Sequence, residues 1–152
     1  MEIGGNNTSY PAGNLSNFTA RKFIFRGFEC ASIEGVLQGL KSPYPHIQSE
    51  IFKMVGIKAM RRGRKIDWKK KQELYWQGTS IKRDSQQYQD LLDELYSCVF
   101  NQCSNFRKEL KDTGNAILKH SIGKNKIQDT VLTEREFCSR LMRLRELCKG
   151  AD

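Results

Sequence analysis

The sequence predicts an α+β fold, a single mainly helical domain over residues 1–152 with a small strand component near its start. The chain has 152 residues, of which 38% are hydrophobic and 28% charged, as is typical of a globular domain and not of a disordered chain. A chain of this length can bury a core without disulfide or metal support. Apolar residues recur at helical spacing through most of the chain, and the clearest strand-like alternation lies in residues 22–30.

The first elements are expected to be a loop, a strand and a helix. Residues 1–20 are rich in Gly, Asn and Ser, which predicts an irregular opening. In residues 22–30, KFIFRGFEC, the phenylalanines alternate as in a short strand, and Gly27 favours a turn or bulge. A helix should begin at Ser32, whose hydroxyl can accept a hydrogen bond from a first-turn amide. Its apolar stripe consists of Val36, Leu37 and Leu40.

Four more elements are expected after Pro43 and Pro45, which end this helix. Residues 45–56 predict a second helix closed by Gly56, and residues 85–103 carry the strongest internal helical pattern. Its apolar side consists of Tyr88, Leu91, Leu92, Leu95 and Val99. A short helix is expected over residues 105–112, ending at Gly114, and a second strand over residues 115–121.

The last helix has the clearest start signal. Thr133 and Glu136 are spaced as a capping box, and Leu132 and Phe137 as a hydrophobic staple. The buried stripe of this helix is expected to be Phe137, Leu141, Leu144 and Cys148. No repeat, low-complexity tract or proline-rich linker divides the chain, so a single domain is expected.

The formal net charge of +9 favours an anionic partner such as a polyphosphate or nucleic acid. Much of the excess lies in residues 58–71, where eight Lys or Arg side chains and one Asp give a net charge of +7. This segment is either a solvated face or a phosphate-contacting surface. Trp68, Tyr75 and Trp76 within and after it are either base-stacking residues or core anchors.

The five cysteines do not form a recognisable framework. Their number is odd and no CxxC pair occurs, so neither disulfides nor a zinc knuckle fits. Buried, reduced thiols are expected; a nucleophilic cysteine served by His46 or His120 is the weaker alternative. No carboxylate and histidine cluster has metal-ligand spacing, so no metal or other cofactor is expected.

A cytoplasmic location without membrane insertion is expected. The N-terminus, MEIGGNNTSYPAG, lacks the basic start and apolar centre of a secretory signal, and no run of about 18 apolar residues follows. The Asn-X-Ser/Thr triplets near the N-terminus therefore carry no glycosylation prediction.

Several sequence blocks in a fixed order resemble the NADAR family, the YbiA-like N-glycosidases. The blocks are LSNF at 15–18, SIEGVLQGLK at 32–41, LKDTGNAIL at 110–118 and FCSRLMRLREL at 137–147. The match covers the chain from about residue 15 to about residue 149. The resemblance implies hydrolysis of an N-glycosidic bond between a ribose phosphate or ADP-ribose unit and an amine or base. Riboflavin-pathway intermediates and ADP-ribosylated guanine in nucleic acid are the substrates associated with the family.

The same resemblance implies the site residues. The signature block falls on Ser32, Glu34, Gln38 and Lys41, and the LSNF loop adds Asn17 and Phe18 as substrate-binding residues. Bond cleavage passes through an oxocarbenium-like state, which a carboxylate beside the anomeric carbon stabilises, and Glu34 is the candidate. Its place in the first helical turn predicts that it stays ionised. Gln38, one turn later, would hold a sugar hydroxyl or base edge, and Lys41 a phosphate or the leaving group.

The chain departs from the family pattern after its Thr-Gly block. An ungapped count from Thr113 and Gly114 places His120 where the family has a glutamate, and the expected Asp and Trp-Gly pair fall on Asn125 and Gln128. Asp129 is the candidate for the missing second carboxylate if the loop shifts register. The alternatives are therefore a binding module for ADP-ribose, a nucleotide or modified nucleic acid that cleaves nothing, and a plain nucleic-acid-binding protein.

Overall fold

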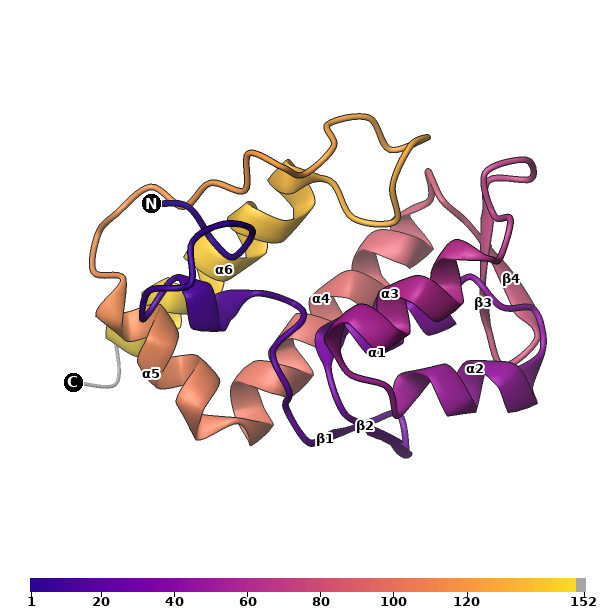
Figure 1. Cartoon of the computed structure of the whole chain (residues 1–152), viewed down its shortest axis with the longest axis horizontal. Helices are drawn as coiled ribbons and strands as arrows, with labels where there is room; N and C mark the ends of the chain where they lie inside the picture. The colour runs from indigo at the N-terminus through magenta and orange to yellow at the C-terminus, as the bar shows by residue number, and fades with distance from the viewer. Residues whose placement is uncertain (150–152) are drawn as a thin grey trace.

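The long helix α4, Gln86–Gln102, forms the centre of the fold (Figure 1). Two strands, β1 (Phe23–Phe25) and β4 (Thr79–Lys82), and two helices, α5 (Ser104–Asp112) and α6 (Glu134–Lys149), pack against it. The computed structural model describes residues 1–149. Ser85 caps α4 by accepting a hydrogen bond from the Tyr88 amide at 3.2 Å. The predicted apolar side of α4 is confirmed, since all five of its residues are buried.

Three short helices follow residues 23–30 in the chain: α1, Ile33–Gly39; α2, Pro45–Phe52; and α3, Gly56–Arg64. Both α2 and α3 pack against α1, which is buried on all sides. The prediction that Gly56 closes the second helix is wrong, because α2 ends at Phe52 and Gly56 begins α3. Gly56 has a φ of 53°, a backbone conformation that residues with a side chain rarely adopt. It permits the change of chain direction between the two helices.

Two antiparallel hairpins supply all the strands of residues 1–149. The first, β1 Phe23–Phe25 and β2 Phe28–Cys30, confirms the predicted strand segment, with its turn at Arg26 and Gly27. The second, β3 Glu73–Trp76 and β4 Thr79–Lys82, was not predicted. The strand expected over residues 115–121 is wrong. Within the described chain that segment makes only an isolated parallel bridge between Glu2 and Lys119.

The C-terminal half closes the core. After α4 come α5, Ser104–Asp112, a long loop over residues 113–133, and α6, Glu134–Lys149. In Figure 1 this loop runs along one edge of the molecule, above α3 and α4. The predicted capping box is confirmed: the Glu136 amide donates to Thr133 Oγ1 at 3.1 Å, and the Thr133 amide donates to Glu136 Oε1 at 2.8 Å. The N-terminal segment contributes one short 3-10 helix, Gly13–Leu15.

The aromatic residues near the basic segment belong largely to the core. Trp68 is 5% exposed, and the Trp76 ring lies 5.6 Å from the Phe52 ring in a stacked arrangement. Trp76 therefore packs from the second hairpin against the core, and Trp68 is almost fully enclosed. No helix in the described part of the chain is long and apolar enough to cross a membrane.

Candidate active site

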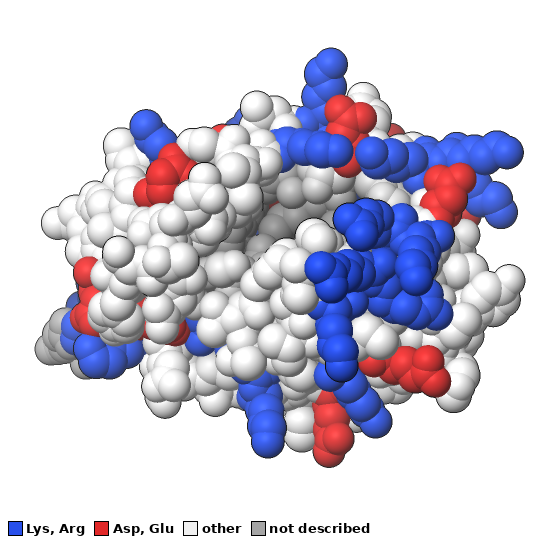
Figure 2. All heavy atoms as spheres, viewed as in Figure 1, with Lys and Arg blue, Asp and Glu red and all other residues white. Residues whose placement is uncertain are grey.

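A cavity of about 720 Å³ lies between α1, α3 and the loop before α6. The space-filling view shows a hollow on this face of the molecule (Figure 2). Seven residues that the sequence singled out lie around it, from segments up to 112 positions apart: Asn17, Phe18, Glu34, Gln38, Lys41, His120 and Asp129.

Helix α1 carries the central polar groups of the cavity. Its glycines allow α2 to approach closely, since a Cβ on Gly35 would lie 2.9 Å from the Ile51 carbonyl oxygen and one on Gly39 would lie 2.7 Å from the Phe52 ring, too close for a side chain. Ser32 begins α1: its hydroxyl accepts from the Gly35 amide at 2.9 Å and donates to the Met54 carbonyl at 2.8 Å. Ser32 is fully buried and does not line the cavity. Ser32 therefore orients α1 and contributes no atom to the cavity lining.

Glu34 projects from α1 toward the cavity and is 9% exposed. Gln38 Nε2 donates to its Oε1 at 2.7 Å. Burial raises the pKa of the Glu34 carboxyl, while the Gln38 hydrogen bond and the charges of Lys41 and His120 oppose the shift only in part. Burial thus acts against the start of the helix, and this carboxyl is harder to ionise than an exposed glutamate. That Glu34 acts as a carboxylate stays a prediction.

Lys41 lies beside Glu34 and shares its desolvated surroundings. Burial lowers the pKa of Lys41 to about 8, with the Glu34 carboxylate opposing the shift and Lys69 and Lys124 adding to it. An ammonium with this pKa is mostly charged at neutral pH and can still release a proton. A carboxyl and an amine with opposed pKa shifts in one cavity are typical of a site built for proton transfer.

Gln38 fills the space between Glu34 and α3. A Cβ on Gly63 would overlap its Oε1 and would lie 2.6 Å from its Cβ, so only glycine at position 63 leaves room for this side chain. Gln38 Oε1 is buried and has no hydrogen-bond partner among the described residues. The amide thus holds the Glu34 carboxyl in place, and its oxygen is the one fully buried polar atom of Glu34, Gln38 and Lys41 without a partner among the described residues.

Asn17 and Phe18 line the cavity from the segment that precedes β1. The Tyr96 hydroxyl donates to Asn17 Oδ1 at 2.8 Å, which orients the amide so that its NH2 group is the end left for other acceptors. The Asn17 carbonyl also accepts from the Glu34 amide at 3.0 Å, which ties this loop to the start of α1. Phe18 is 39% exposed at the rim, near Gly56.

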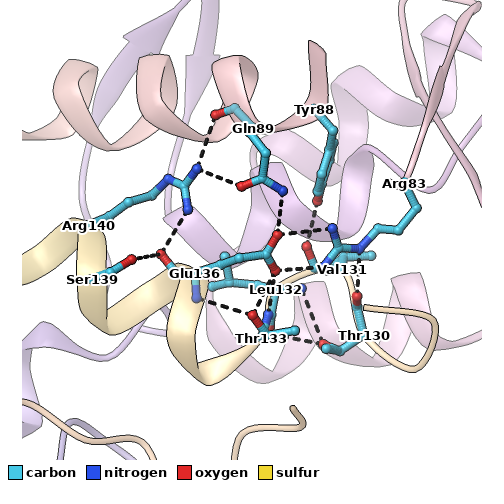
Figure 3. Close-up of polar contacts among 10 residues, drawn as sticks. All are labelled: Arg83, Tyr88, Gln89, Thr130, Val131, Leu132, Thr133, Glu136, Ser139 and Arg140. Carbon is cyan, nitrogen blue, oxygen red and sulfur yellow. Dashed lines mark hydrogen bonds and ion pairs between the residues drawn. The ribbon is translucent and has the colours of Figure 1, made fainter. Parts of the chain in front are cut away.

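The loop wall is held by a buried polar network (Figure 3). Arg83, at the end of β4, donates to the Thr130 carbonyl at 2.9 Å and makes two bonds to Glu136, at 2.6 and 3.0 Å. The Tyr88 hydroxyl donates to the Val131 carbonyl at 2.7 Å. Burial alone would raise the pKa of Glu136, but hydrogen bonds from Arg83, Gln89 and Thr133 outweigh it and lower the pKa. This network fixes the backbone next to Asp129.

Asp129 itself lies exposed where this loop meets the cavity. It is therefore at the rim, whereas Glu34 lies deep. His120 is the residue that sequence analysis assigned no role in the site, and the structure places its half-buried ring on the cavity wall. The sequence named it only as an alternative partner of a nucleophilic cysteine and by its position in the count, where the family pattern has an acid.

Basic side chains border the cavity on the α3 side. Arg64, Lys65, Lys69 and Lys124 all line it, and Figure 2 shows Lys and Arg atoms gathered beside the hollow, over α3 and the following loop. Glu34, Asp67 and Asp129 also line the cavity, but these four basic side chains and Lys41 give five cations against three acids. The cavity mouth is thus suited to an anionic ligand.

The remaining candidates of the sequence lie outside the site. The His46 side chain is 87% exposed and pairs with Glu50, and burial raises the pKa of Cys30 and Cys138 to about 12, which disfavours thiolate chemistry. Within residues 1–149 no group of three or more His, Cys, Asp or Glu side chains is arranged to hold a metal ion.

The family model described as Bacteriophage protein GP30.3 matches residues 9–146. The chain belongs to this family. A relative from Enterobacteria phage T4, the uncharacterized 17.1 kDa protein in the Gp30-rIII intergenic region, is 33% identical over 144 residues, which cover 92% of this chain and 93% of that one. The matched residues include all the cavity-lining segments, from Asn17 to Phe137.

The solved structure of the Escherichia coli protein YbiA is similar to this chain over 99% of its length and 86% of the YbiA chain, with a TM-score of 0.64 and 20% identity. The YbiA-like α+β fold predicted from the sequence blocks is thereby confirmed.

Proposed function

We propose that this protein is an N-glycosidase that hydrolyses the bond between a ribose phosphate or ADP-ribose unit and an amine or base. One observation carries the proposal: the buried Glu34 carboxyl, fixed by Gln38 and next to Lys41, lies in a 720 Å³ cavity bordered by cations. A cavity of this volume is in the range of small-ligand sites. The resemblance to the NADAR N-glycosidases supports the same assignment.

The chemistry follows from these groups. As the C–N bond breaks, its electron pair goes to the leaving nitrogen and positive charge develops on the sugar carbon. The Glu34 carboxylate stabilises that charge in a water-poor site, where electrostatic effects are strong. Lys41, whose pKa is about 8, gives the leaving nitrogen a proton. Water supplies the new C–O bond and loses one proton, so the products are the free sugar hydroxyl and the free amine or base.

The substrate is a small phosphate-bearing N-riboside or an ADP-ribosylated nucleic acid. Both carry phosphates that Arg64, Lys65 and Lys69 can meet at the cavity mouth. Asn17 and the rim residue Phe18 are suited to contact the sugar or base, the amide by hydrogen bonding and the ring by packing. Asp129, exposed at the rim, stays a candidate for a second carboxylate.

The test is turnover by the purified protein and by a Glu34→Gln variant. Each is incubated with DNA carrying ADP-ribosylated guanine and with a ribosylaminopyrimidine phosphate, and products are identified by mass spectrometry. The parent should release base or amine from at least one substrate. The variant, which keeps the shape of the side chain, should lose about a hundredfold or more in rate while still binding.

The second candidate is a binding module that retains the ligand and cleaves nothing. The observation that favours it is the exposed rim position of Asp129, which leaves Glu34 without a second carboxyl group of comparable burial. Tight binding of ADP-ribose by both parent and variant, with no product from either, would select this alternative. A plain nucleic-acid-binding protein would instead bind unmodified strands with steep salt dependence and ignore free nucleotides.

A further inference from the structure

We propose that His120 is the group that removes the proton from the attacking water, in place of the carboxylate that the family pattern has at that position. This inference rests on the proposed function. It concerns a residue to which neither the sequence blocks nor the fold assigns a role.

The first supporting observation is how the ring is held. His120 Nδ1 lies 2.7 Å from the Ile3 carbonyl oxygen, which can only accept, so Nδ1 carries the hydrogen. The neutral ring then has its lone pair on Nε2. No hydrogen bond to Nε2 is found among the residues that the structure describes. The ring is therefore fixed in the tautomer that leaves a free basic nitrogen.

The second observation is where the ring lies. It is half-buried on the cavity wall, with its edge against the Phe137 ring at a centroid distance of 5.3 Å. The His120 amide donates to Glu134 Oε2 at 2.6 Å, so main chain and side chain are both anchored. Such anchoring holds a proton-transfer group in one orientation.

The third observation is the electrostatic link to Glu34. The charge of a protonated His120 acts on the Glu34 carboxyl, as that of Lys41 does. The carboxylates that face His120 are Glu34 from α1, Glu2 from the N-terminal segment and Glu134 from α6. Asp129, by contrast, is exposed at the rim.

The step balances without any further reactant. The water oxygen bonds to the anomeric carbon as the C–N bond breaks, and one water proton moves to His120 Nε2. Lys41 gives a proton to the leaving nitrogen, and the two side chains return to their starting states by exchange with solvent. Glu34 remains the stabiliser of the positive sugar and Lys41 the acid.

The decisive variant is His120→Asn. The asparagine amide can donate to the Ile3 carbonyl as Nδ1 does, but it has no basic nitrogen in the place of Nε2. We expect unchanged thermal stability, a nearly unchanged KM and a kcat lower by about 10²- to 10⁴-fold. In a His120→Ala variant, added imidazole should restore part of the rate, in proportion to its unprotonated fraction. A purely structural role would not produce this rescue.

The Asp129→Asn variant tests whether His120 or Asp129 is the base that takes the proton of the attacking water. It should lose less activity than His120→Asn, and the opposite order would overturn the inference in favour of Asp129. An active parent whose His120→Asn variant keeps a kcat within threefold would overturn the inference and leave the proposed function intact. A parent that cleaves neither substrate would overturn the proposed function, and the assignment of His120 with it.

Discussion

The fold shields the Glu34 carboxyl group from solvent, and the residue is only 9% exposed. Its pKa is raised by burial, so the folded protein holds the Glu34 proton more tightly than the unfolded chain does. Folding stability should then fall as the pH rises through the unfolded value of about 4.5 toward the folded value, and the loss persists above both. Each unit of upward shift corresponds to about 1.4 kcal/mol.

The Glu34→Gln variant should therefore be more stable than the parent at pH 8, and this advantage should disappear below pH 4. Glutamine has the same shape and cannot ionise, so the cost of burying the charge is removed while packing is kept. Thermal unfolding across this pH range measures the difference. Glu29→Gln, at an exposed glutamate on β2, is the control and should show no comparable gain. A Glu34→Gln variant less stable than the parent at pH 8 would contradict the conclusion that burying the Glu34 charge destabilises the folded protein.

Lys41 makes a separate prediction about activity. If the ammonium donates its proton to the leaving nitrogen, the rate should fall as the pH rises through about 8, the pKa of Lys41. At pH 9 the charged fraction, and hence the rate, should be about tenfold below its plateau. In Lys41→Arg this alkaline limb should be absent, because arginine stays charged, and the plateau should be lower. A parent whose rate is flat from pH 7 to pH 9 would exclude Lys41 as the acid.

At the level of secondary structure, the cavity depends on a loop without regular structure. Residues 113–133 would be free to move if only their ends were fixed. Instead, Arg83 binds both the Thr130 carbonyl and the Glu136 carboxylate, and these bonds join β4 to the start of α6. Arg83 is 1% exposed, so its charge is fully dependent on these partners.

The Arg83→Met variant should be destabilised by about 3 to 5 kcal/mol, the usual effect of removing one member of a buried ion pair. Glu136 would lose its cation but keep donors from Thr133 and Gln89. Thermal or denaturant unfolding gives the value, and activity at low temperature shows whether the loop wall is still formed. Lys108→Met removes an exposed pair with Asp112 and should change stability little. Equal effects of the two variants would show that the network does not anchor the loop.

Sequence patterns recovered the elements whose ends have chemical signals. The Ser32 cap, the Thr133–Glu136 capping box and the apolar side of α4 all follow from local rules. The hairpin at residues 73–82 was missed because its turn, Gln77 and Gly78, is a weak hairpin signal and its strands lie beside a run of lysines. Helix α3 was missed for a similar reason. Its buried positions include the small residues Ala59 and Gly63, which lie among charged residues and give no apolar stripe at helical spacing.

The site was predictable only in part. Glu34 and Gln38 share helix α1 and Lys41 follows two residues after its end, so their spacing placed them together. His120 reaches the cavity through a loop whose path is set by contacts with Ile3 and Glu134, about 117 and 14 positions away. No local pattern encodes such contacts. The rise in the Glu34 pKa could not be predicted for the same reason, because the burial that causes it comes from helices α2 and α3 packing around α1.

The charge of the whole molecule is distributed unevenly in relation to the cavity. The segment of residues 58–71 carries most of the net excess, and part of it lines the cavity while Lys70 and Lys71 do not. A small phosphate-bearing riboside would occupy only the cavity. A polymer carrying the modified base would extend beyond the mouth and bring further phosphates within reach of these two lysines.

The double variant Lys70→Gln/Lys71→Gln therefore separates the two substrate sources. For a nucleic-acid substrate we expect weaker binding and a slope of log K against log salt that is smaller by about 1.4 to 1.8, because each phosphate contact contributes roughly 0.7 to 0.9. Turnover of a small riboside should be unchanged. The control is Lys22→Gln/Lys53→Gln, which removes the same charge from exposed lysines beside β1 and after α2. If both double variants weaken nucleic-acid binding equally, the attraction comes from net charge alone. If only the first does, the polymer lies along the basic segment as its base enters the cavity.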